Sequence, residues 1–430
     1  MKDTLIRTHY EPIQETVLSE TLPNGLKIFV FPKEGYSKNF AFFATNYGGM
    51  DTRFYHDRAW RDTPLGVAHF LEHKMFDTKD GNALQILSAN GASPNAFTGA
   101  ALTGYYFEGT DGFAENLKTL LAFVSEPYFT KESVDKEQGI IGQEIQMIED
   151  NPNWQVYMRL MAALYREYPV RNSVAGSIDS IAQITDETLY QCHAAFYQPS
   201  NMVLCVAGDV NPKQVFDAAK KILPKEGKGS IARDYGTPER PQVNEKESTL
   251  AMEVSTPIFQ LGFKLKPAED GRERLRQKLL GELVCEIWMG TSSALYAKLY
   301  EEGLINQSFF CGYEAYPGAA FLIAGGESRD PAALREAILK EAERLAREGI
   351  EEELFQRVKK AAYGNQMRAL NSFEYLCVEQ ARAYFAEEDL WIFPQMYDTI
   401  QKEDVEKALR DWIDNDRTAL SVITPKGAGA

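Results

Sequence analysis

The apolar and polar positions along the chain recur with two different periods, which predicts a mixture of strands and helices. Strands are expected where short apolar runs end in turn residues, at residues 26–31, 40–46, 95–109, 202–207 and 261–263. Helices are expected where apolar residues recur every three to four positions, at residues 67–76, 83–90, 116–124, 131–148, 271–288, 332–347, 352–370 and 403–413. Because the two kinds of element are interspersed, the pattern predicts an α+β protein.

A polar stretch near the middle of the chain marks a domain boundary. The chain has 430 residues, which is more than one hydrophobic core usually holds. Residues 224–244 are rich in Lys, Gly, Pro and Arg and contain few apolar residues, a composition typical of a linker. We therefore predict an N-terminal domain at residues 1–223, a linker at residues 224–248 and a C-terminal domain at residues 249–430.

A pattern in the first half of the sequence recurs in the second half. Residues 184–206 and residues 400–422 each combine a capped helix, a polar turn and a short apolar strand. The two copies lie about half a chain length apart, which predicts two halves of similar α+β fold. All the histidines lie in the first half, so only that half can build a histidine metal site.

Composition and charge narrow the range of functions. A formal charge of −16 disfavours nonspecific binding to nucleic acid and to anionic membranes. The N-terminus lacks the apolar core of a signal peptide, and we expect no membrane span because no apolar run is long enough. The cysteines are scattered and form no C-x-x-C pair, so we expect buried free thiols and a cytoplasmic protein. They are Cys192, Cys205, Cys285, Cys311 and Cys377.

His69, Glu72 and His73 form the motif H-x-x-E-H, the inverse of the common zinc-protease sequence H-E-x-x-H. On a helix, residues four apart share one face, so the two imidazoles can bind one metal ion. Glu72 can then reach a metal-bound water and take its proton. His193 stands beside a cysteine, but no third ligand is evident, and we interpret it as a packed helix residue.

A catalytic zinc site normally has three protein ligands, so a carboxylate must come from another segment. The predicted helix at residues 131–148 offers Glu137 and Glu144, which lie nearly two turns apart on one face. This spacing suits one metal ligand and one outer partner that orients a histidine. From the residues alone, which glutamate binds the metal stays open, because Glu149 and Asp150 are also near.

The sequence resembles the inverzincin metallopeptidases, the family of pitrilysin, insulin-degrading enzyme and mitochondrial processing peptidase. Residues 66–73, residues 91–98 and the two downstream glutamates carry the resemblance. It implies two similar halves, each a mostly antiparallel sheet packed with helices and joined by a linker, that form half of a clamshell chamber. It also implies a zinc-dependent endopeptidase that hydrolyses short or unfolded peptides.

The resemblance implies a role for each site residue. It assigns Zn²⁺ binding to His69, His73 and Glu144, and water activation to Glu72 as general base. It places Glu137 behind the site, where we count it with Glu72 as part of the catalytic machinery.

The sequence departs from the family in its second half. Self-sufficient members supply an Arg and a Tyr there, but Tyr300 stands at the position of the Arg and Gln307 stands near that of the Tyr. Lys298 and Tyr300 do not reproduce a bidentate guanidinium. The chain is similar to the zinc-bearing subunit of bacterial two-subunit members, so we expect a heterodimer with a zinc-less homologous subunit that contributes Arg and Tyr.

The predicted substrate-binding residues are Asn95, Ala96 and Phe97, on an edge strand that continues into residues 101–108. A peptide could add to this strand through backbone hydrogen bonds. The alternative is a core strand with Asn95 in a turn. Two alternative functions also stay open: a non-catalytic subunit that binds peptide or acts as a scaffold, and a homodimeric processing peptidase that uses Lys298 or Tyr300.

Overall fold

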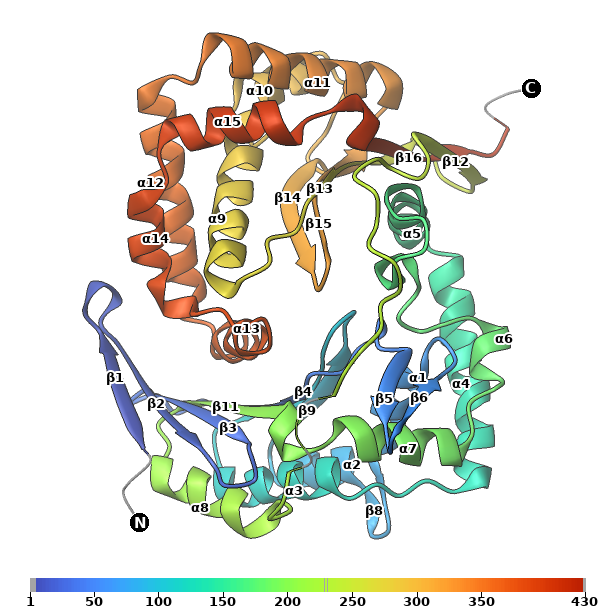
Figure 1. Cartoon of the computed structure of the whole chain (residues 1–430), viewed down its shortest axis with the longest axis vertical. Helices are drawn as coiled ribbons and strands as arrows, with labels where there is room; N and C mark the ends of the chain where they lie inside the picture. The colour runs from blue at the N-terminus through green and yellow to red at the C-terminus, as the bar shows by residue number, and fades with distance from the viewer. Residues whose placement is uncertain (1–4, 228, 230, 428–430) are drawn as a thin grey trace. The chain divides into compact units, whose positions relative to one another are not determined.

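The computed structural model describes residues 5–227, 229 and 231–427, which pack into two compact units (Figure 1). Unit 1 comprises Met1–Ile145, Ser173–Tyr235 and Met367–Leu390. Unit 2 comprises Gln146–Asn172, Gly236–Gln366 and Trp391–Ala430. Each unit has its own sheet and its own helices, so the predicted α+β fold is confirmed.

Seven strands form the sheet of unit 1 in the order β1-β2-β3-β11-β4-β10-β9. Their bounds are β1 Ile6–Tyr10, β2 Glu15–Thr21, β3 Lys27–Pro32, β4 Asn39–Thr45, β9 Ser93–Thr98, β10 Thr103–Gly109 and β11 Met202–Gly208. Strand β11 runs parallel to β3, and the other neighbouring pairs are antiparallel. Every residue of β4 and β11 is buried, as expected for central strands that are covered on both faces.

The single strand predicted at residues 95–109 is two strands joined by a tight reversal. The Gly99 N–H donates to the Leu102 carbonyl at 2.8 Å, and the Gly49 N–H donates to the Gly99 carbonyl at 3.0 Å. A Cβ on Gly48 would lie 2.5 Å from the Ala100 backbone, so glycine is required for this close approach. As a result β9 is an edge strand, whereas β10 is paired on both sides and is not part of the edge.

Helices cover both faces of the unit 1 sheet (Figure 1). The helices of unit 1 are α1 Val67–Met75, α2 Ala83–Ala89, α3 Phe113–Ser125, α4 Lys131–Glu149, α6 Ile178–Ile181, α7 Asp186–Phe196, α8 Pro212–Ile222 and α13 Phe373–Phe385. Helices α3 and α8 lie on one face, and α13 lies on the other against β11 and β4. Two hairpins complete the unit, β5 Arg53–His56 with β6 Ala59–Asp62 and β7 Asp77–Thr78 with β8 Gly81–Asn82.

Unit 2 is built on a five-stranded sheet in the order β12-β16-β13-β15-β14. Its strands are β12 Glu247–Met252, β13 Ile258–Leu265, β14 Phe310–Tyr316, β15 Ala319–Glu327 and β16 Thr418–Pro425. Its helices are α5 Pro152–Leu164, α9 Gly271–Trp288, α10 Ala294–Glu301, α11 Pro331–Glu348, α12 Glu352–Ala369, α14 Phe393–Thr399 and α15 Lys402–Trp412. Short 3₁₀ turns lie in both units, at Glu11–Ile13, Pro169–Arg171, Pro199–Asn201, Leu390–Ile392 and Asn415–Arg417.

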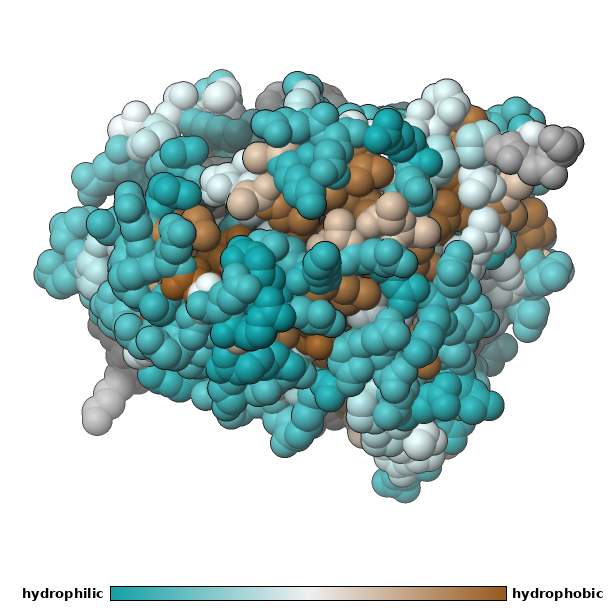
Figure 2. Space-filling view, turned by 90° about the horizontal axis from the view of Figure 1, so that it is seen from above, coloured by the Kyte–Doolittle hydropathy of each residue, from teal (hydrophilic) through white to brown (hydrophobic). Residues whose placement is uncertain are grey.

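Helix α11 shows how the surface of unit 2 follows from its sequence. Its buried positions are Leu334, Ile338, Ala342 and Leu345, spaced three or four residues apart. Its exposed positions are mostly Glu, Lys and Arg. Figure 2 looks onto the side of unit 2 that carries α11, and hydrophilic side chains cover most of that face.

The two sheets share a topology, which supports the predicted duplication. Strand β16 pairs in parallel with β12 and antiparallel with β13, as β11 pairs in parallel with β3 and antiparallel with β4. In each unit a capped helix, α7 or α15, leads through a 3₁₀ turn into this central strand. The two halves of the sequence therefore form similar folds.

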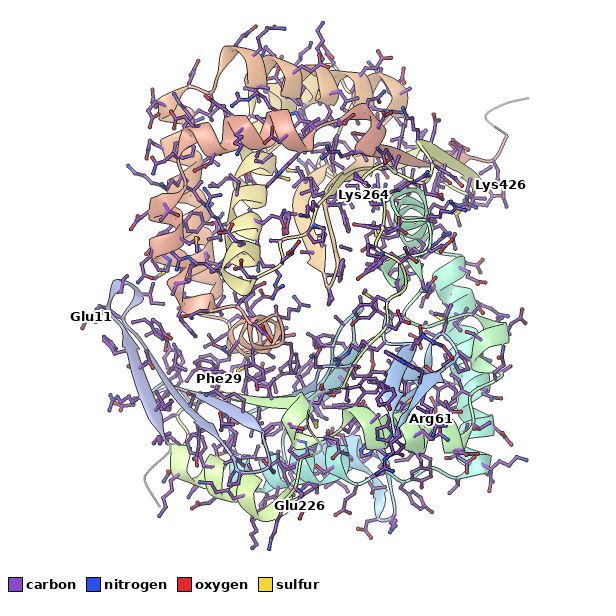
Figure 3. All side chains as sticks on the ribbon, viewed as in Figure 1. Glu11, Phe29, Arg61, Glu226, Lys264 and Lys426 are labelled. Carbon is purple, nitrogen blue, oxygen red and sulfur yellow. The ribbon has the colours of Figure 1, made fainter. Side chains whose placement is uncertain are left out.

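The compact units are not the contiguous segments 1–223 and 249–430, because the halves exchange helices. Helix α13 comes from the second half but packs in unit 1. There, the ring of Tyr384 lies 5.9 Å from that of Phe29, which Figure 3 labels. Helix α5 comes from the first half but packs on β13 and β16 in unit 2. Both helices are apolar on one face, and that periodicity does not specify which sheet will cover it.

The predicted linker makes contacts with both units. In unit 1, Arg233 pairs with the buried Asp51 at 2.8 Å. In unit 2, one oxygen of Glu239 accepts the backbone N–H groups of residues 166–168 at 2.8–3.0 Å. The other oxygen pairs at 3.1 Å with Lys264, whose ammonium is buried (Figure 3). These contacts hold Arg233 and Glu239 in place, although the composition of the segment predicts flexibility.

Candidate metal centre

Helix α1 carries the H-x-x-E-H motif, and a glycine makes its position possible. Gly66 precedes the helix with φ +91°, and a Cβ there would lie 2.6 Å from the Ala175 carbonyl oxygen. Only glycine adopts this backbone conformation at no steric cost. One turn apart on the helix, the rings of His69 and His73 have centroids 4.6 Å apart. The motif is therefore helical and its imidazoles are adjacent, as predicted.

Helix α4 brings both predicted glutamates to these histidines. Glu144 Oε1 lies 3.6 Å from His69 Nε2, and Glu144 Oε2 lies 3.7 Å from His73 Nε2. Glu137 Oε1 lies 3.1 Å from the other ring nitrogen of His73, Nδ1. The residues alone left open which glutamate binds the metal. The geometry favours Glu144, because it faces both Nε2 atoms, whereas Glu137 lies behind one ring.

The donor set fits a zinc ion. One ligand atom from each of His69, His73 and Glu144 can be chosen so that all three lie within 4.8 Å of one another. Zinc bonds of about 2.0–2.1 Å in a tetrahedron put ligand atoms about 3.4 Å apart, close to the two histidine–glutamate distances. Two imidazoles, one carboxylate and an outer carboxylate on one imidazole are the arrangement of catalytic zinc sites.

The electrostatics of the cluster favour a cation. Burial, together with the neighbouring His73, lowers the pKa of His69 to about 4, so this imidazole is neutral near pH 7, as a metal ligand must be. Burial also lowers the pKa of His73, but the hydrogen bond with Glu137 and the surrounding carboxylates outweigh it, and the pKa is raised. Carboxylates that stabilise a protonated imidazole would stabilise a metal cation in the same place.

Glu72 lies close to the candidate metal ligands His73 and Glu144 and is largely buried. Its side chain is only 7% exposed, and burial raises its pKa. A hydrogen bond at 2.7 Å from the Thr98 hydroxyl opposes that shift. Thr98 was not predicted as a site residue, although it directly follows the predicted residues Asn95–Phe97; its contact with Glu72 depends on how β9 packs on α1.

The predicted substrate-binding residues lie on β9 at the edge of the sheet. Asn95 is exposed and Phe97 stacks on Phe42 with ring centroids 5.8 Å apart. Ala96 pairs with Tyr105 of β10. In the part of the chain that the structure describes, no strand pairs with the outer side of β9. The outer side of β9 is therefore an unpaired strand edge. One backbone N–H of this strand, that of Ala96, donates to Asn95 Oδ1 at 2.9 Å.

The residues considered as replacements for the missing Arg and Tyr lie in unit 2, whereas the metal ligands lie in unit 1. Lys298 and Tyr300 are on α10, and Tyr300 is 46% exposed and stacks on Tyr296. Gln307 is exposed in the loop before β14. His193 is buried, with Nε2 3.1 Å from the Val124 carbonyl oxygen, so it is a packed helix residue as predicted.

The structure also bears on the predictions for the cysteines and for membrane spans. All five cysteines are free thiols, and every one except Cys311 is buried. Among the described residues, no helix combines the length and the apolar character that crossing a bilayer requires.

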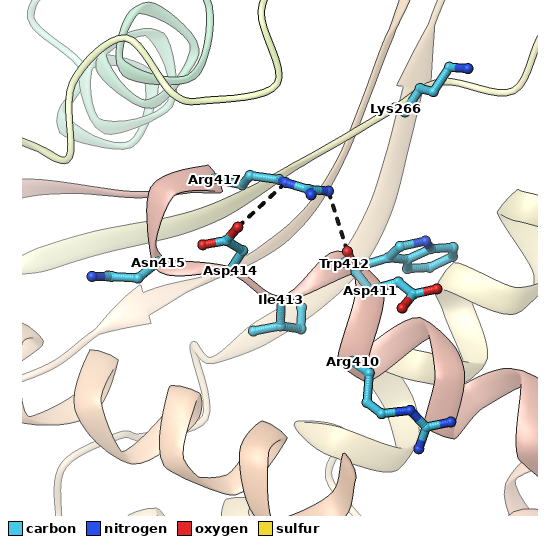
Figure 4. A pocket seen from close by; sticks show the side chains of 8 residues that line it. All are labelled: Lys266, Arg410, Asp411, Trp412, Ile413, Asp414, Asn415 and Arg417. Atoms are coloured by element: carbon cyan, nitrogen blue, oxygen red, sulfur yellow. Dashed lines mark hydrogen bonds and ion pairs between the residues drawn. The ribbon is translucent and has the colours of Figure 1, made fainter.

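A surface hollow in unit 2 contains none of the predicted site residues. It has a volume of about 770 Å³ and lies at the end of α15 (Figure 4). Arg417 is held there by the carboxylate of Asp414 and by the carbonyl of Asp411. Cationic and anionic groups are mixed in its lining, which includes Lys266 and Arg410, so the hollow presents no consistent charge to a ligand.

Comparison with known proteins agrees with this geometry. The family described as Insulinase (Peptidase family M16) matches residues 59–177, which contain α1 and α4. The family described as Peptidase M16 inactive domain matches residues 183–362. The uncharacterized zinc protease YmfH of Bacillus subtilis (strain 168) is 38% identical over 97% of this chain and 98% of its own length. Zinc protease PqqE of Helicobacter pylori is 26% identical over 77% of this chain and 73% of its own.

Solved structures show the same fold. An M16-like peptidase from Alicyclobacillus acidocaldarius has a TM-score of 0.92 at 30% identity, covering 96% of this chain and 99% of its own. A protease from Helicobacter pylori has a TM-score of 0.81 at 20% identity, covering 95% and 99%. The extent of the match to YmfH, the two matching family models and the H-x-x-E-H helix together show that this chain belongs to the M16 peptidase family.

Proposed function

We propose that this chain is the zinc-bearing subunit of an endopeptidase that hydrolyses short or unfolded peptides. The convergence of His69, His73 and Glu144, from two helices that lie far apart in the sequence, carries the proposal. The zinc-protease names of relatives such as YmfH support the identity of the metal. A scaffold would have no chemical need for this donor set together with a buried carboxylate at position 72.

Each group of the site would have its own role in peptide hydrolysis. Zinc held by His69, His73 and Glu144 would supply the positive charge that acidifies water and polarises a peptide carbonyl. Glu72, fixed by its hydrogen bond to Thr98, would accept the proton of the attacking water and later donate it to the leaving amine. The peptide itself would add to the open edge of β9 through backbone hydrogen bonds, which favours extended chains over folded ones.

We further propose that activity requires a homologous zinc-less subunit. An anionic tetrahedral intermediate needs a positive or hydrogen-bonding group in addition to the metal. At position 300, where self-sufficient members carry Arg, this chain has a tyrosine, so a partner would supply the Arg and the Tyr. The free thiols support a reducing compartment, and we propose the cytoplasm.

Cleavage of an unfolded fluorogenic peptide tests both proposals. We expect the purified chain to bind one zinc ion and to cleave slowly, and the mixture with its homologous subunit to cleave rapidly. Glu72→Gln should abolish cleavage by the mixture while zinc content is retained. Rapid cleavage by the chain alone would refute the partner requirement. Wild-type cleavage by the Glu72→Gln mixture would refute the role of Glu72, and an inactive mixture with full zinc content would favour a scaffold.

A further inference from the structure

Lys74, the residue after the motif, is one of the most deeply buried charged residues of the described chain. It is 1% exposed, and the residues three and four positions before it on α1, Leu71 and Phe70, are apolar and fully buried. A buried ammonium is costly unless carboxylates and hydrogen bonds compensate for its lost hydration. Lysine at this position therefore requires partners, and the structure provides two.

Both partners are carboxylates, and one of them belongs to the metal centre. Lys74 Nζ makes a short contact with Asp77 on β7 and lies 3.6 Å from Glu137 Oε2. The second oxygen of Glu137, Oε1, lies 3.1 Å from His73 Nδ1. Glu137 thus divides its oxygens between two neighbouring residues of α1, with the imidazole on one and the ammonium on the other.

This arrangement constrains the orientation of the His73 ring. When Nδ1 carries the ring proton and donates a hydrogen bond to Glu137, Nε2 is left with a lone pair that faces Glu144. A carboxylate bonded only through Oε1 could rotate about its terminal torsion, because that torsion has no sharp minimum. Contact of Oε2 with the buried ammonium of Lys74, which is also paired with Asp77, opposes that rotation.

We propose that Lys74 is a positioning residue of the metal centre, which acts through Glu137 to hold His73 with Nε2 directed at the metal position. Asp77 in turn anchors the ammonium, so that Asp77, Lys74, Glu137 and His73 form one connected chain of contacts. This inference rests on the proposed function, because it assumes that His73 binds zinc. It assigns a role in metal affinity to a residue outside the H-x-x-E-H motif.

The experiment measures zinc affinity of the full-length chain rather than peptide cleavage. The metal is removed with a chelator, and the dissociation constant for Zn²⁺ is measured by competition with a chromophoric chelator. Thermal unfolding of the metal-free chain is recorded in parallel. The variants are Lys74→Met, which keeps the length but removes the charge, Glu137→Gln, and the double variant. Lys33→Met is the matched control, because Lys33 also pairs with a poorly exposed glutamate in unit 1, Glu15, at 2.6 Å.

Lys74→Met and Glu137→Gln should each weaken zinc binding by about 10- to 100-fold, the usual effect of losing an outer partner of a metal ligand. The double variant should be no weaker than Glu137→Gln, because both changes act through the same imidazole. Lys33→Met should leave the zinc dissociation constant within about twofold of wild type, since it touches no member of the metal centre.

Two outcomes would overturn the proposal: wild-type zinc affinity in Lys74→Met, or losses in the two single variants that multiply in the double variant. If Lys74→Met does not fold, Lys74→Gln, which keeps an N–H donor, replaces it and should weaken zinc binding at least several-fold. Failure of both variants to fold would show a structural role and refute positioning. Failure of the proposed function looks different, because the wild-type chain itself would then not bind zinc.

Discussion

Removing the hydroxyl of Thr98 tests whether Glu72 is a base held in place by the edge strand. Thr98→Val retains a β-branched side chain suited to β9 but deletes the donor that lies 2.7 Å from Glu72 Oε2. Thr98 contacts Glu72 rather than a metal ligand, so the change should leave the metal site intact. Thr98→Ser restores a hydroxyl and serves as the conservative variant.

The expected magnitude follows from the burial of Glu72. Its side chain is 7% exposed, so water has little access to replace the lost donor. A hydrogen bond to a charged group contributes about 1.5–3 kcal/mol, and each 1.4 kcal/mol corresponds to a tenfold change in rate. We therefore expect kcat/KM to fall by roughly 10- to 100-fold.

The pH profile provides a second readout with a definite sign. Burial raises the pKa of Glu72, and the Thr98 hydrogen bond opposes that rise. Losing the hydrogen bond should raise the pKa further, so that Glu72 is protonated at a higher pH. The acidic limb of the kcat/KM profile should consequently move toward neutral pH in Thr98→Val, because only the ionised carboxylate accepts a proton.

The assay is peptide cleavage by the chain assembled with its homologous subunit, over pH 5–9, with zinc content measured on each variant. Thr119→Val, on the exposed side of α3, is the control for a threonine hydroxyl that bonds elsewhere, to the Glu115 carbonyl. The reasoning is wrong if Thr98→Val keeps wild-type kcat/KM, or if Thr98→Ser is as impaired as Thr98→Val.

Three further predictions concern the metal, the linker and the start of the motif helix. Glu144→Gln should weaken zinc binding by more than about 100-fold because it removes the anionic ligand, and competition with a chelator measures it; unchanged affinity would assign the third ligand elsewhere. Glu239→Gln should destabilise unit 2 by about 3–5 kcal/mol at pH 7, because it leaves the buried Lys264 ammonium unpaired. Burial raises the pKa of Glu239, but the backbone N–H groups and Lys264 have the larger effect and lower it. The stabilisation from the ionised Glu239 is therefore present above the ordinary Glu pKa and is lost as pH falls through the lowered pKa. Denaturant unfolding at pH 7 and at pH 3 should show that the variant's loss of stability is smaller in acid. Gly66→Ala should cost at least about 1–3 kcal/mol in unfolding free energy, since φ is +91° and the new Cβ would meet the Ala175 carbonyl; a stable variant would contradict the requirement for glycine.

Local periodicity located the motif helix and the long helices α4, α9, α11 and α12, but it missed other elements, among them β1, β2, α5 and α13. The helix predicted at residues 271–288 coincides with α9, and that predicted at residues 67–76 differs from α1 by one residue. The spacing of His69 and His73 also determined that their side chains lie next to each other, because residues four apart on a helix share one face whatever surrounds them. The resemblance carried by the motif and the two glutamates identified the family.

Long-range packing decided the rest. The register of α4 on α1 determined that Glu144 faces both Nε2 atoms and that Glu137 lies behind His73. The spacing of two glutamates on one helix face does not say which of them faces the histidines. The same packing brought Thr98 to Glu72 and buried Lys74. It also assigned α5 and α13 to the opposite units, because an apolar helix face is satisfied by any sheet of matching shape and only the complete tertiary structure selects one.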